Sequence, residues 1–319
     1  MPKKLAVIAI GGNSLIKHRD KRTVEDQYQA ICETTTHLVE LVEQGYQLVI
    51  THGNGPQVGF IMLRSEIARK EVGLHIVPLS SCVADTQGAI GLQIQQALGD
   101  ELAKRGFAPS AVTVVTQVEV DERDPGFASP DKPIGEFYTE EELATLTKQH
   151  PEWILKQDAN RGYRRVVASP VPRKIVEQDA VNVLLAGGFH VITAGGGGIP
   201  VVRSEQGLVS VDAVIDKDKT AALLARNLNA SLLVISTAVE QVKLNFGSSD
   251  ERPLGLVTVA EMEQYLADGH FAPGSMAPKI EAAIAFIRDG GKKVIITNPE
   301  NIGEAIRHDR GTQIVPQEN

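Results

Sequence analysis

The sequence predicts an α/β fold built on a mostly parallel sheet with helices on both faces. Short, mainly apolar runs alternate along the chain with longer segments of helical periodicity, and such alternation is typical of parallel sheets. Glycine-rich turns follow three of these runs, at residues 11–13, 53–55 and 195–198. A strand that is buried on both faces of a sheet is expected to be apolar along its whole length, as the run at 5–10 is.

Apolar periodicity and glycine stops predict the elements of the first half in chain order. They are strands at 5–10, 47–51 and 112–116 and helices at 23–44 and 85–105. The same signals, with a capping box at Thr258 and Glu261, predict the second half. Its elements are helices at 173–185 and 216–228, further helices after Thr258 and from Pro278, and strands at 190–193, 231–236, 293–297 and 312–315.

Residues 122–169 interrupt this alternation. The stretch holds prolines at positions 125, 130, 133 and 151, and a capping box at Thr139 and Glu142 predicts one short helix within it. A long irregular stretch inside an α/β domain is typical of a functional segment. We therefore expect a protruding subdomain or lid here.

Composition narrows the class of protein. The 319 residues carry 32 basic and 40 acidic side chains, a net charge of −8, which argues against a nucleic-acid partner because phosphate contacts need a basic face. Cys32 and Cys82 have neither metal-binding nor disulfide spacing, which favours a reducing compartment. No signal peptide or membrane span is expected. The prediction is a cytoplasmic protein that binds neither nucleic acid nor membrane.

The three glycine turns predict an anion site. Each follows a predicted strand, and ligands of parallel α/β sheets bind beyond the carboxyl ends of the strands. Glycine lets backbone N–H groups approach a phosphate or carboxylate. The Walker sequence GxxxxGK[ST] is absent and the dinucleotide fingerprint GxGxxG is incomplete, so a nucleotide would bind by a less common scheme. The alternative is a set of tight turns without a ligand.

Three lysines lie in predicted turns or at the start of predicted helices. Lys217, with Asp218 beside it, stands where an apolar run passes into a helix, and Lys279 stands in the first turn of another helix. A cation at a helix N-terminus opposes the macrodipole and usually has an anionic partner, which here is Asp218 or a phosphate. Lys132 lies between two prolines of the irregular stretch. The alternative at each position is a solvated surface charge.

The histidines and arginines predict no further site. The histidines lack metal-ligand spacing, so no protein-built metal site is expected. His52, beside the second glycine turn, is expected to make a structural hydrogen bond. The basic cluster Arg161–Arg165 is expected to form salt bridges within the irregular stretch.

Seven motifs, in order, resemble carbamate kinase, a branch of the amino-acid kinase superfamily. They are GGN, HGNGPQVG, DKPIGEFYTEEE, QDANRGYRRVVASP, GGGGIPVV, VDAVIDKD and GHFAPGSMAPKIEAA, which run from Gly11 to about Glu281. The resemblance implies an open αβα sandwich of two lobes. Residues 1–204 would form the carbamate or carbamoyl-phosphate lobe, with the lid subdomain at about 122–169, and residues 205–319 the nucleotide lobe. It also implies a homodimer.

The resemblance also implies which residues form the site. The substrate and the transferring phosphoryl group would lie against Gly11, Gly12, Asn13, Gly53, Asn54, Gly55 and Gly197. The catalytic groups would be Lys132, Lys217, Asp218 and Lys279, with Asp218 orienting the lysines. ATP or ADP, with Mg²⁺ carried by its phosphates, would lie against Lys217, Thr237, Ala238, Val239, Val242, Phe246, Gly274, Ser275, Met276 and Lys279.

The implied reaction suits these residue types. Carbamate is already an anion, so its oxygen needs no general base to attack the γ-phosphorus, and positioning with charge neutralisation supplies the catalysis. The chain departs from the family pattern at Asp131, where threonine is usual, at Asn160 (glycine), at Glu240 (aspartate) and at Phe246 (tyrosine).

Three alternatives stay open. The first is another kinase of amino-acid carboxylates, and the second is a carbamate-kinase-like paralogue that binds ligand without useful turnover. The third is a nicotinamide-dependent oxidoreductase, which the incomplete fingerprint disfavours.

Overall fold

The computed structural model describes residues 4–11, 15, 23–108, 111–157 and 162–317. Within that part of the chain, an eight-stranded sheet runs through the molecule in the order β15-β17-β16-β12-β1-β2-β9-β3. β16 and β17 pair antiparallel, and the other neighbours are parallel. The strands are β1 (Lys4–Ile10), β2 (Tyr46–His52), β3 (Ala111–Thr113), β9 (His190–Ile192), β12 (Leu232–Ser236), β15 (Leu256–Thr258), β16 (Val294–Thr297) and β17 (Thr312–Val315).

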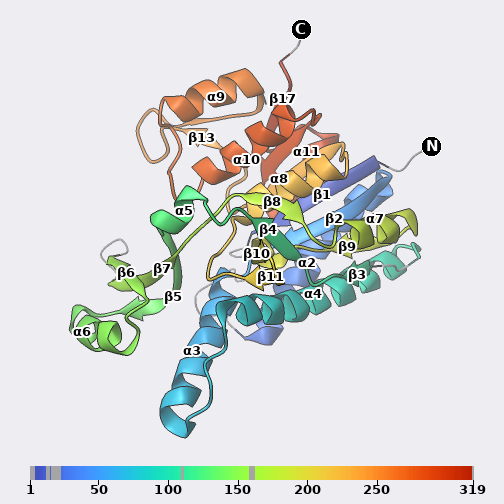
Figure 1. Ribbon diagram of the computed structural model, residues 1–319. Helices are drawn as coiled ribbons and strands as arrows, with labels where there is room; N and C mark the ends of the chain where they lie inside the picture. Colours follow the sequence, from blue (N-terminus) through green and yellow to red (C-terminus); the bar gives the residue numbers. More distant parts are fainter. Residues whose placement is uncertain (1–3, 12–14, 16–22, 109–110, 158–161, 318–319) are drawn as a thin grey trace.

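Helices cover both faces of this sheet (Figure 1). Ala6 and Ile8 of β1 pack among residues of α2 (Val24–Glu43), α4 (Leu79–Lys104) and α11 (Ile302–Arg307). Val7 and Ala9 face the opposite layer, to which α8 (Lys217–Asn227), α9 (Val259–Ala267) and α10 (Ala277–Arg288) contribute. This alternation along a fully buried strand explains why the run is apolar throughout. The predicted αβα fold class is confirmed.

Smaller sheets flank the main one. A four-stranded sheet has the order β11-β10-β4-β8, and a three-stranded sheet the order β5-β7-β6. Their strands are β4 (Gln117–Val120), β5 (Lys132–Tyr138), β6 (Ile154–Gln157), β7 (Tyr163–Val167), β8 (Pro172–Ile175), β10 (Ile199–Ser204) and β11 (Gly207–Ser210). The remaining elements are β13 (Lys243–Leu244), β14 (Arg252–Pro253), α3 (Gly55–Val72), α5 (Pro125–Ala128), α6 (Glu140–Gln149), α7 (Gln178–Ala186) and the short helices at Gly195–Gly197 and Pro299–Asn301.

The three-stranded sheet and α6 project from the body (Figure 1). We call residues 122–169 the lid. The capping box of Thr139 and Glu142 is present at the start of α6, as predicted. The stretch is otherwise more regular than expected, because β5, β6 and β7 pair with each other. α3 projects beside it and contacts β5.

Several boundaries differ from the sequence prediction. α3 was not expected: apart from Val58, Met62 and Ser65 its described residues are not buried, so it lacks an apolar stripe. α4 begins at Leu79 rather than at 85. The helix expected at 173–185 is instead strand β8 followed by α7, since β8 pairs with β4 at the edge of the small sheet.

The two predicted lobes share one sheet, because β1 pairs with β2 on one side and with β12 on the other. The hydrophobic core is therefore not divided at residue 204, and the division into a substrate lobe and a nucleotide lobe stays a prediction about function. Among the described helices, none has the length and apolar character needed to cross a bilayer. Cys32 and Cys82 are both free thiols.

Two glycines of α4 give a matched test of packing. A Cβ at Gly91 would overlap the Thr113 side chain of β3, whereas one at Gly88 meets nothing. We expect Gly91→Ala to lower the free energy of unfolding by about 1–3 kcal/mol through overpacking. Gly88→Ala should be neutral or raise it by up to about 1 kcal/mol. Urea denaturation of both variants checks this, and equal midpoints would contradict it.

Candidate active site

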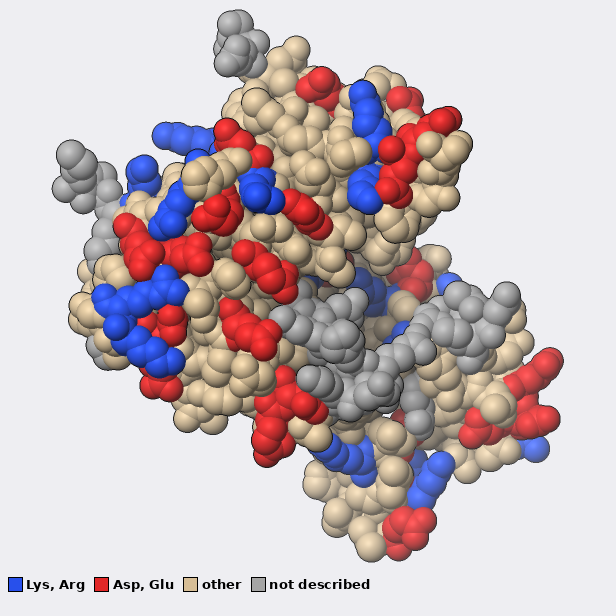
Figure 2. Space-filling view, turned by 180° about the vertical axis from the view of Figure 1, so that it is seen from behind, with Lys and Arg blue, Asp and Glu red and all other residues tan. Residues whose placement is uncertain are grey.

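A cleft of about 360 Å³ lies where parallel strands of the main sheet end. Gly11 follows β1, residues 53–55 follow β2, and Thr237 and Ala238 follow β12. Figure 2 shows this side of the molecule hollowed, with Lys or Arg side chains in the hollow. The cleft is lined by Gly11, Gly53, Asn54, Gly55, Pro56, Lys132, Gly196, Val214, Ile215, Asp216, Lys217, Asp218, Ser236, Thr237, Ala238, Gly274, Ser275, Pro278 and Lys279.

The glycine turns are packed closely against one another. The amide of Gly53 donates to the carbonyl of Ile10 at 2.8 Å, which ties the ends of β2 and β1 together. Asn54 precedes α3, and its Nδ2 donates to Thr86 Oγ1 at 2.8 Å. Gly196 has φ +69°, and a Cβ there would collide with the Asn54 side chain. Backbone therefore forms this wall of the cleft, and α3 begins there with N–H groups suited to an anion.

Asp218 holds two lysines at the floor of the cleft. Lys217 Nζ lies 2.5 Å from Asp218 Oδ1, and Lys279 Nζ lies 2.8 Å from Oδ2. The Asp218 side chain is 3 % exposed, against 13 % and 15 % for the lysines. Lys217 stands at the start of α8 and Lys279 near the start of α10. One carboxylate therefore fixes two ammonium groups from different helices, and the trio carries a net positive charge.

Burial and charge act together on the pKa values of this trio. Burial alone would raise the pKa of Asp218, but the charges of Lys217 and Lys279 outweigh it and hold that pKa below its usual value. Burial lowers the pKa of Lys217, and the charge of Lys279 lowers it further, while Asp218 opposes both effects. Asp218 is thus a carboxylate at neutral pH, and Lys217 is a cation that loses its proton more readily than an ordinary lysine.

Asp216 is a cleft residue that the sequence reasoning missed. It is the N-cap of α8, where its Oδ1 accepts from the amide of Asp218 at 2.9 Å. Its Oδ2 also lies 3.2 Å from Nζ of Lys132, which comes from β5 of the lid. The signal was available, because an aspartate directly before a predicted helix is a preferred N-cap. Lid and helix α8 therefore meet at this carboxylate.

Ser236 was also missed. It ends β12 and lines the cleft, and its buried Oγ has no hydrogen-bond partner among the described residues. A buried hydroxyl in that state is suited to a ligand. Its signal in the sequence was weak, since a serine at the end of an apolar strand is common.

The structure brings most of the predicted site residues to the cleft, but not all. Gly197 does not line it: a Cβ there would collide with the carbonyl of Ile215, and the Gly197 carbonyl accepts from Thr220 Oγ1 at 2.9 Å. Gly197 thus lets α8 pack closely against this turn, and Gly196 lines the cleft in its place. Gly12, Asn13, Asn160 and Arg161 lie outside the described residues.

Of the residues predicted to contact the adenine nucleotide, some line the cleft and others do not. Thr237, Ala238, Gly274 and Ser275 line the cleft, whereas Val239 does not. Val242 is fully buried in the core, and Met276 packs against that core. Phe246 is 72 % exposed. These last residues lie outside the cleft, so their predicted contacts with a nucleotide would depend on a ligand that extends beyond it.

His52 is buried and structural. Its Nδ1 lies 3.1 Å from the carbonyl of Gly53, and its ring packs where a Cβ of Gly195 would be. Burial lowers the pKa of His52 to about 4, so the ring is neutral near pH 7. The described residues contain no group of three or more His, Cys, Asp or Glu side chains that could hold a metal ion.

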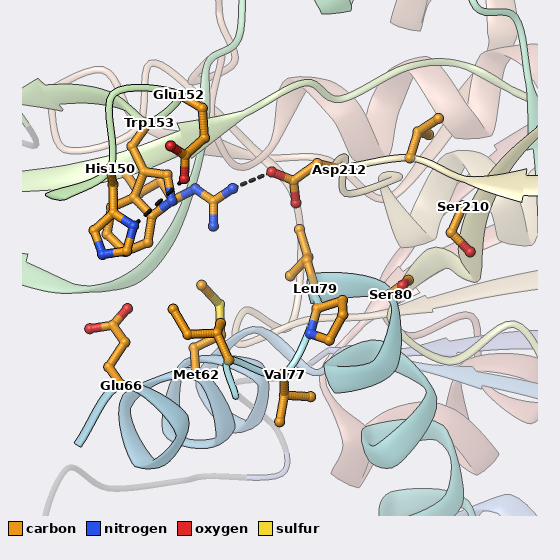
Figure 3. Close-up of a pocket in the computed structure, with 14 residues that line it drawn as sticks. Met62, Glu66, Val77, Leu79, Ser80, His150, Glu152, Trp153, Ser210 and Asp212 are labelled. Carbon is orange, nitrogen blue, oxygen red and sulfur yellow. Dashed lines mark hydrogen bonds and ion pairs between the residues drawn. The ribbon is translucent and has the colours of Figure 1, made fainter. Parts of the chain in front are cut away.

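A second cavity, of about 330 Å³, lies between α3, the start of α4 and the lid (Figure 3). Arg165 of β7 stacks over the ring of Trp153 at 4.8 Å and pairs with Asp212. The basic cluster was expected to form salt bridges within the irregular stretch, but Asp212 lies outside it, in the segment before α8. The amide of Val214 in that segment donates to the carbonyl of Ala168 at 2.9 Å. The lid is therefore fastened to the segment that carries Asp216 and Lys217.

Comparisons with known proteins agree with this geometry. The model of the amino acid kinase family matches residues 4–298. The chain is 53 % identical to the carbamate kinase-like protein YahI of Escherichia coli over 98 % of this chain and 99 % of YahI. It is 43 % identical to the carbamate kinase of Pyrococcus horikoshii over 99 % and 100 % of the two chains. The solved carbamate kinase of Giardia lamblia bound to AMP-PNP superposes with a TM-score of 0.93, at 39 % identity over 99 % of each chain. The chain therefore belongs to the amino acid kinase family and, within it, to the carbamate kinases.

Proposed function

We propose that the chain catalyses reversible phosphoryl transfer between ATP and carbamate, giving ADP and carbamoyl phosphate. The observation that carries this proposal is the Lys217–Asp218–Lys279 trio at the floor of a cleft walled by backbone turns. The trio has a net positive charge suited to phosphate groups. It belongs to a chain whose relatives include carbamate kinases at 42–45 % identity.

The cleft suits a reaction that needs no general base. Asp216 and Asp218 are its lining carboxylates among the described residues, and each already accepts from a lysine. Carbamate attacks through an oxygen that is already anionic, so the protein has to position the reactants and neutralise charge. Lysines and backbone N–H groups do this without exchanging a proton with the substrate.

Each part of the cleft then has a role. Carbamate and the transferring phosphoryl group lie against Gly11 and residues 53–55, while Lys217 and Lys279 hold the nucleotide phosphates. Lys132 reaches the reacting groups from the lid, and its ammonium group pairs with Asp216 at the start of α8. Asp218 is a positioning residue, because it orients the two lysines rather than reacting itself.

Mg²⁺ enters this scheme with the nucleotide. The carboxylates of the cleft are engaged with lysines, so the described residues suit a metal that the phosphates carry rather than one that the protein holds alone. When bound, the metal neutralises phosphate charge. A homodimer, the lobe boundary at residue 204, adenine contacts beyond Thr237 and Ala238, and a cytoplasmic location are parts of the proposal that stay predictions.

The main alternative is a paralogue that binds ligand without useful turnover. It is favoured by one observation, that the relative 53 % identical is named carbamate kinase-like. Lys132, Lys217, Asp218 and Lys279 stand together in the cleft, which favours turnover. The assay below distinguishes the two.

The lysines of the trio should be required for turnover. We expect Lys217→Ala and Lys279→Ala each to lower the rate of ATP formation from ADP, carbamoyl phosphate and Mg²⁺ by at least about 10²–10³-fold, because each removes a preorganised charge. Lys219→Ala is the control, since Lys219 lies on the same helix but pairs with Glu281 and does not line the cleft. Wild-type rates in either trio variant would contradict the assigned roles. Nucleotide binding without ATP formation by the wild type would favour the paralogue.

Removing the shared carboxylate should cost stability as well as activity. Asp218→Asn leaves two largely buried ammonium groups without their anion, and breaking a buried pair costs about 3–5 kcal/mol. Asp289→Asn breaks the half-exposed pair between Asp289, which follows α10, and Arg226 of α8, which should cost at most about 1 kcal/mol. Urea denaturation measures both, and added phosphate should narrow the deficit of Asp218→Asn. An unfolding midpoint equal to that of the wild type would contradict the arrangement.

The lowered pKa of Lys217 should appear in the pH dependence. Only the protonated lysine attracts phosphate, so activity falls as pH rises through its pKa in the free enzyme. That fall in kcat/KM for ADP should come below pH ~10.4, the usual value for lysine. The measurement is ATP formation between pH 7 and 10.5, corrected for spontaneous loss of carbamoyl phosphate. Lys219→Ala should keep the wild-type profile. Constant kcat/KM up to pH ~10.4 would contradict the prediction.

A further inference from the structure

A larger cavity continues from the active-site cleft toward the lid. Its volume is about 670 Å³, and it shares Asn54, Gly55, Pro56, Lys132, Gly196 and Val214 with the cleft. It does not include Lys217, Lys279 or Ser275, which line the opposite end of the cleft. The cavity therefore opens from the side on which the proposed function places the carbamate, away from the nucleotide.

The walls of this cavity are mainly apolar. Their apolar side chains include Phe60 and Leu63 from α3, Val83 from α4, and Ile134 and Phe137 from β5. The charged groups among the described lining residues are Lys132 and Arg164, and no carboxylate lines it. Arg164 donates to the carbonyl of Gly135 at 2.9 Å, and its guanidinium lies 5.0 Å from the ring centre of Phe137. The cavity thus favours a neutral apolar group and disfavours a cation.

Part of the wall belongs to a packed core, which fixes its position. Val83 and Ile134 are 3 % and 6 % exposed and lie in one hydrophobic cluster with Val58 and Met62 of α3. α3 and β5 also approach closely, because a Cβ at Gly59 would lie 3.8 Å from the Cα of Gly135. Cavities that bind organic ligands measure about 300–1,000 Å³ and are mostly apolar.

In the proposed arrangement, carbamate lies in the cleft and leaves this cavity unfilled. It is a small planar ion, and with one oxygen facing the phosphoryl group its nitrogen lies on the other side of the carboxyl carbon. We propose that the cavity accepts an apolar substituent on that nitrogen, so that the enzyme also phosphorylates N-alkylcarbamates, the adducts of primary amines with CO₂. This inference rests on the proposed function, since it uses the same reacting atoms.

The reaction of the substituted substrate is the same transfer. A carboxylate oxygen of the N-alkylcarbamate forms a bond to the γ-phosphorus, and the bond from that phosphorus to the bridging oxygen of ADP breaks. ADP leaves with the electron pair, and the product is an N-alkylcarbamoyl phosphate. The nitrogen keeps its hydrogen and its substituent, and no further reactant is needed.

A series of amines tests the inference. The full-length protein is assayed for ADP formation with ATP, Mg²⁺ and the carbamates that bicarbonate forms with ammonia, methylamine, propylamine and butylamine, each quantified by NMR. We expect kcat/KM to rise about fourfold for each methylene group that leaves water. The monocarbamate of 1,3-diaminopropane matches the butyl compound in length but ends in an ammonium group, and it should react at least about tenfold less well.

Variants locate the substituent. Leu63→Trp fills the cavity without touching the cleft. It should therefore lower kcat/KM for N-butylcarbamate at least about tenfold, while kcat/KM for carbamate stays within about twofold of the wild-type value. Val83→Phe does the same from α4 and replaces Leu63→Trp if that variant folds poorly. Leu256→Trp makes the same exchange at an exposed position on β15 and should leave kcat/KM unchanged for both substrates.

The outcomes separate this inference from the proposed function. If the wild type uses carbamate but N-butylcarbamate neither reacts nor competes, the inference is overturned and the carbamate activity stands. If N-butylcarbamate reacts equally well in Leu63→Trp and Val83→Phe, the placement in this cavity is wrong. If N-butylcarbamate reacts and carbamate does not, the substituted class is the substrate and the proposed acceptor is wrong. Activity with neither overturns both proposals.

Discussion

The shared carboxylate of Asp218 is the interaction on which the site depends. A single buried acid between two ammonium groups offsets their repulsion and fixes both, at 2.5 and 2.8 Å. Burial disfavours an unpaired ion, so the carboxylate offsets the cost of placing two positive charges at this depth. The trio retains one net positive charge, which the protein leaves for a phosphate. Lys217 and Lys279 come from different helices, so the same contact also joins α8 to α10.

The segment before α8 links the lid to that trio. Asp212 pairs with Arg165 of β7, Val214 donates to the carbonyl of Ala168, and Asp216 receives both Lys132 and the first amides of α8. A movement of the lid would therefore act on the residues next to Lys217. The coupling between the lid and these residues rests on specific contacts between the lid and the segment before α8.

Much of the site could be predicted from short sequence signals, because each of its glycine turns is formed by a few neighbouring residues. A strand end followed by glycine predicts a turn where N–H groups are accessible, and the carboxyl ends of parallel strands meet at one edge. Gly11 and residues 53–55 were placed in the cleft on that basis, and Lys217 was placed there from its position at a helix start and its motif. Val242 and Phe246 were assigned by motif alone, and one is buried while the other is exposed. A motif shows that residues are close in sequence, but it does not show which way their side chains point, because packing sets that direction.

The sequence by itself determined the αβα class, the strands of the main sheet other than β15 and most of the helices, because buried strands and capped helices have their own composition and period. Only the tertiary structure decided how distant segments meet. Asp218 could be seen beside Lys217, but its bond to Lys279 needs α8 and α10 side by side. The pairing of β5, β6 and β7 depends on long-range contacts as well, and so do the pairing of Arg165 with Asp212 and the presence of α3, which lacks an apolar stripe. Such contacts leave no periodic trace in the chain, so they emerge only when the fold brings the residues together.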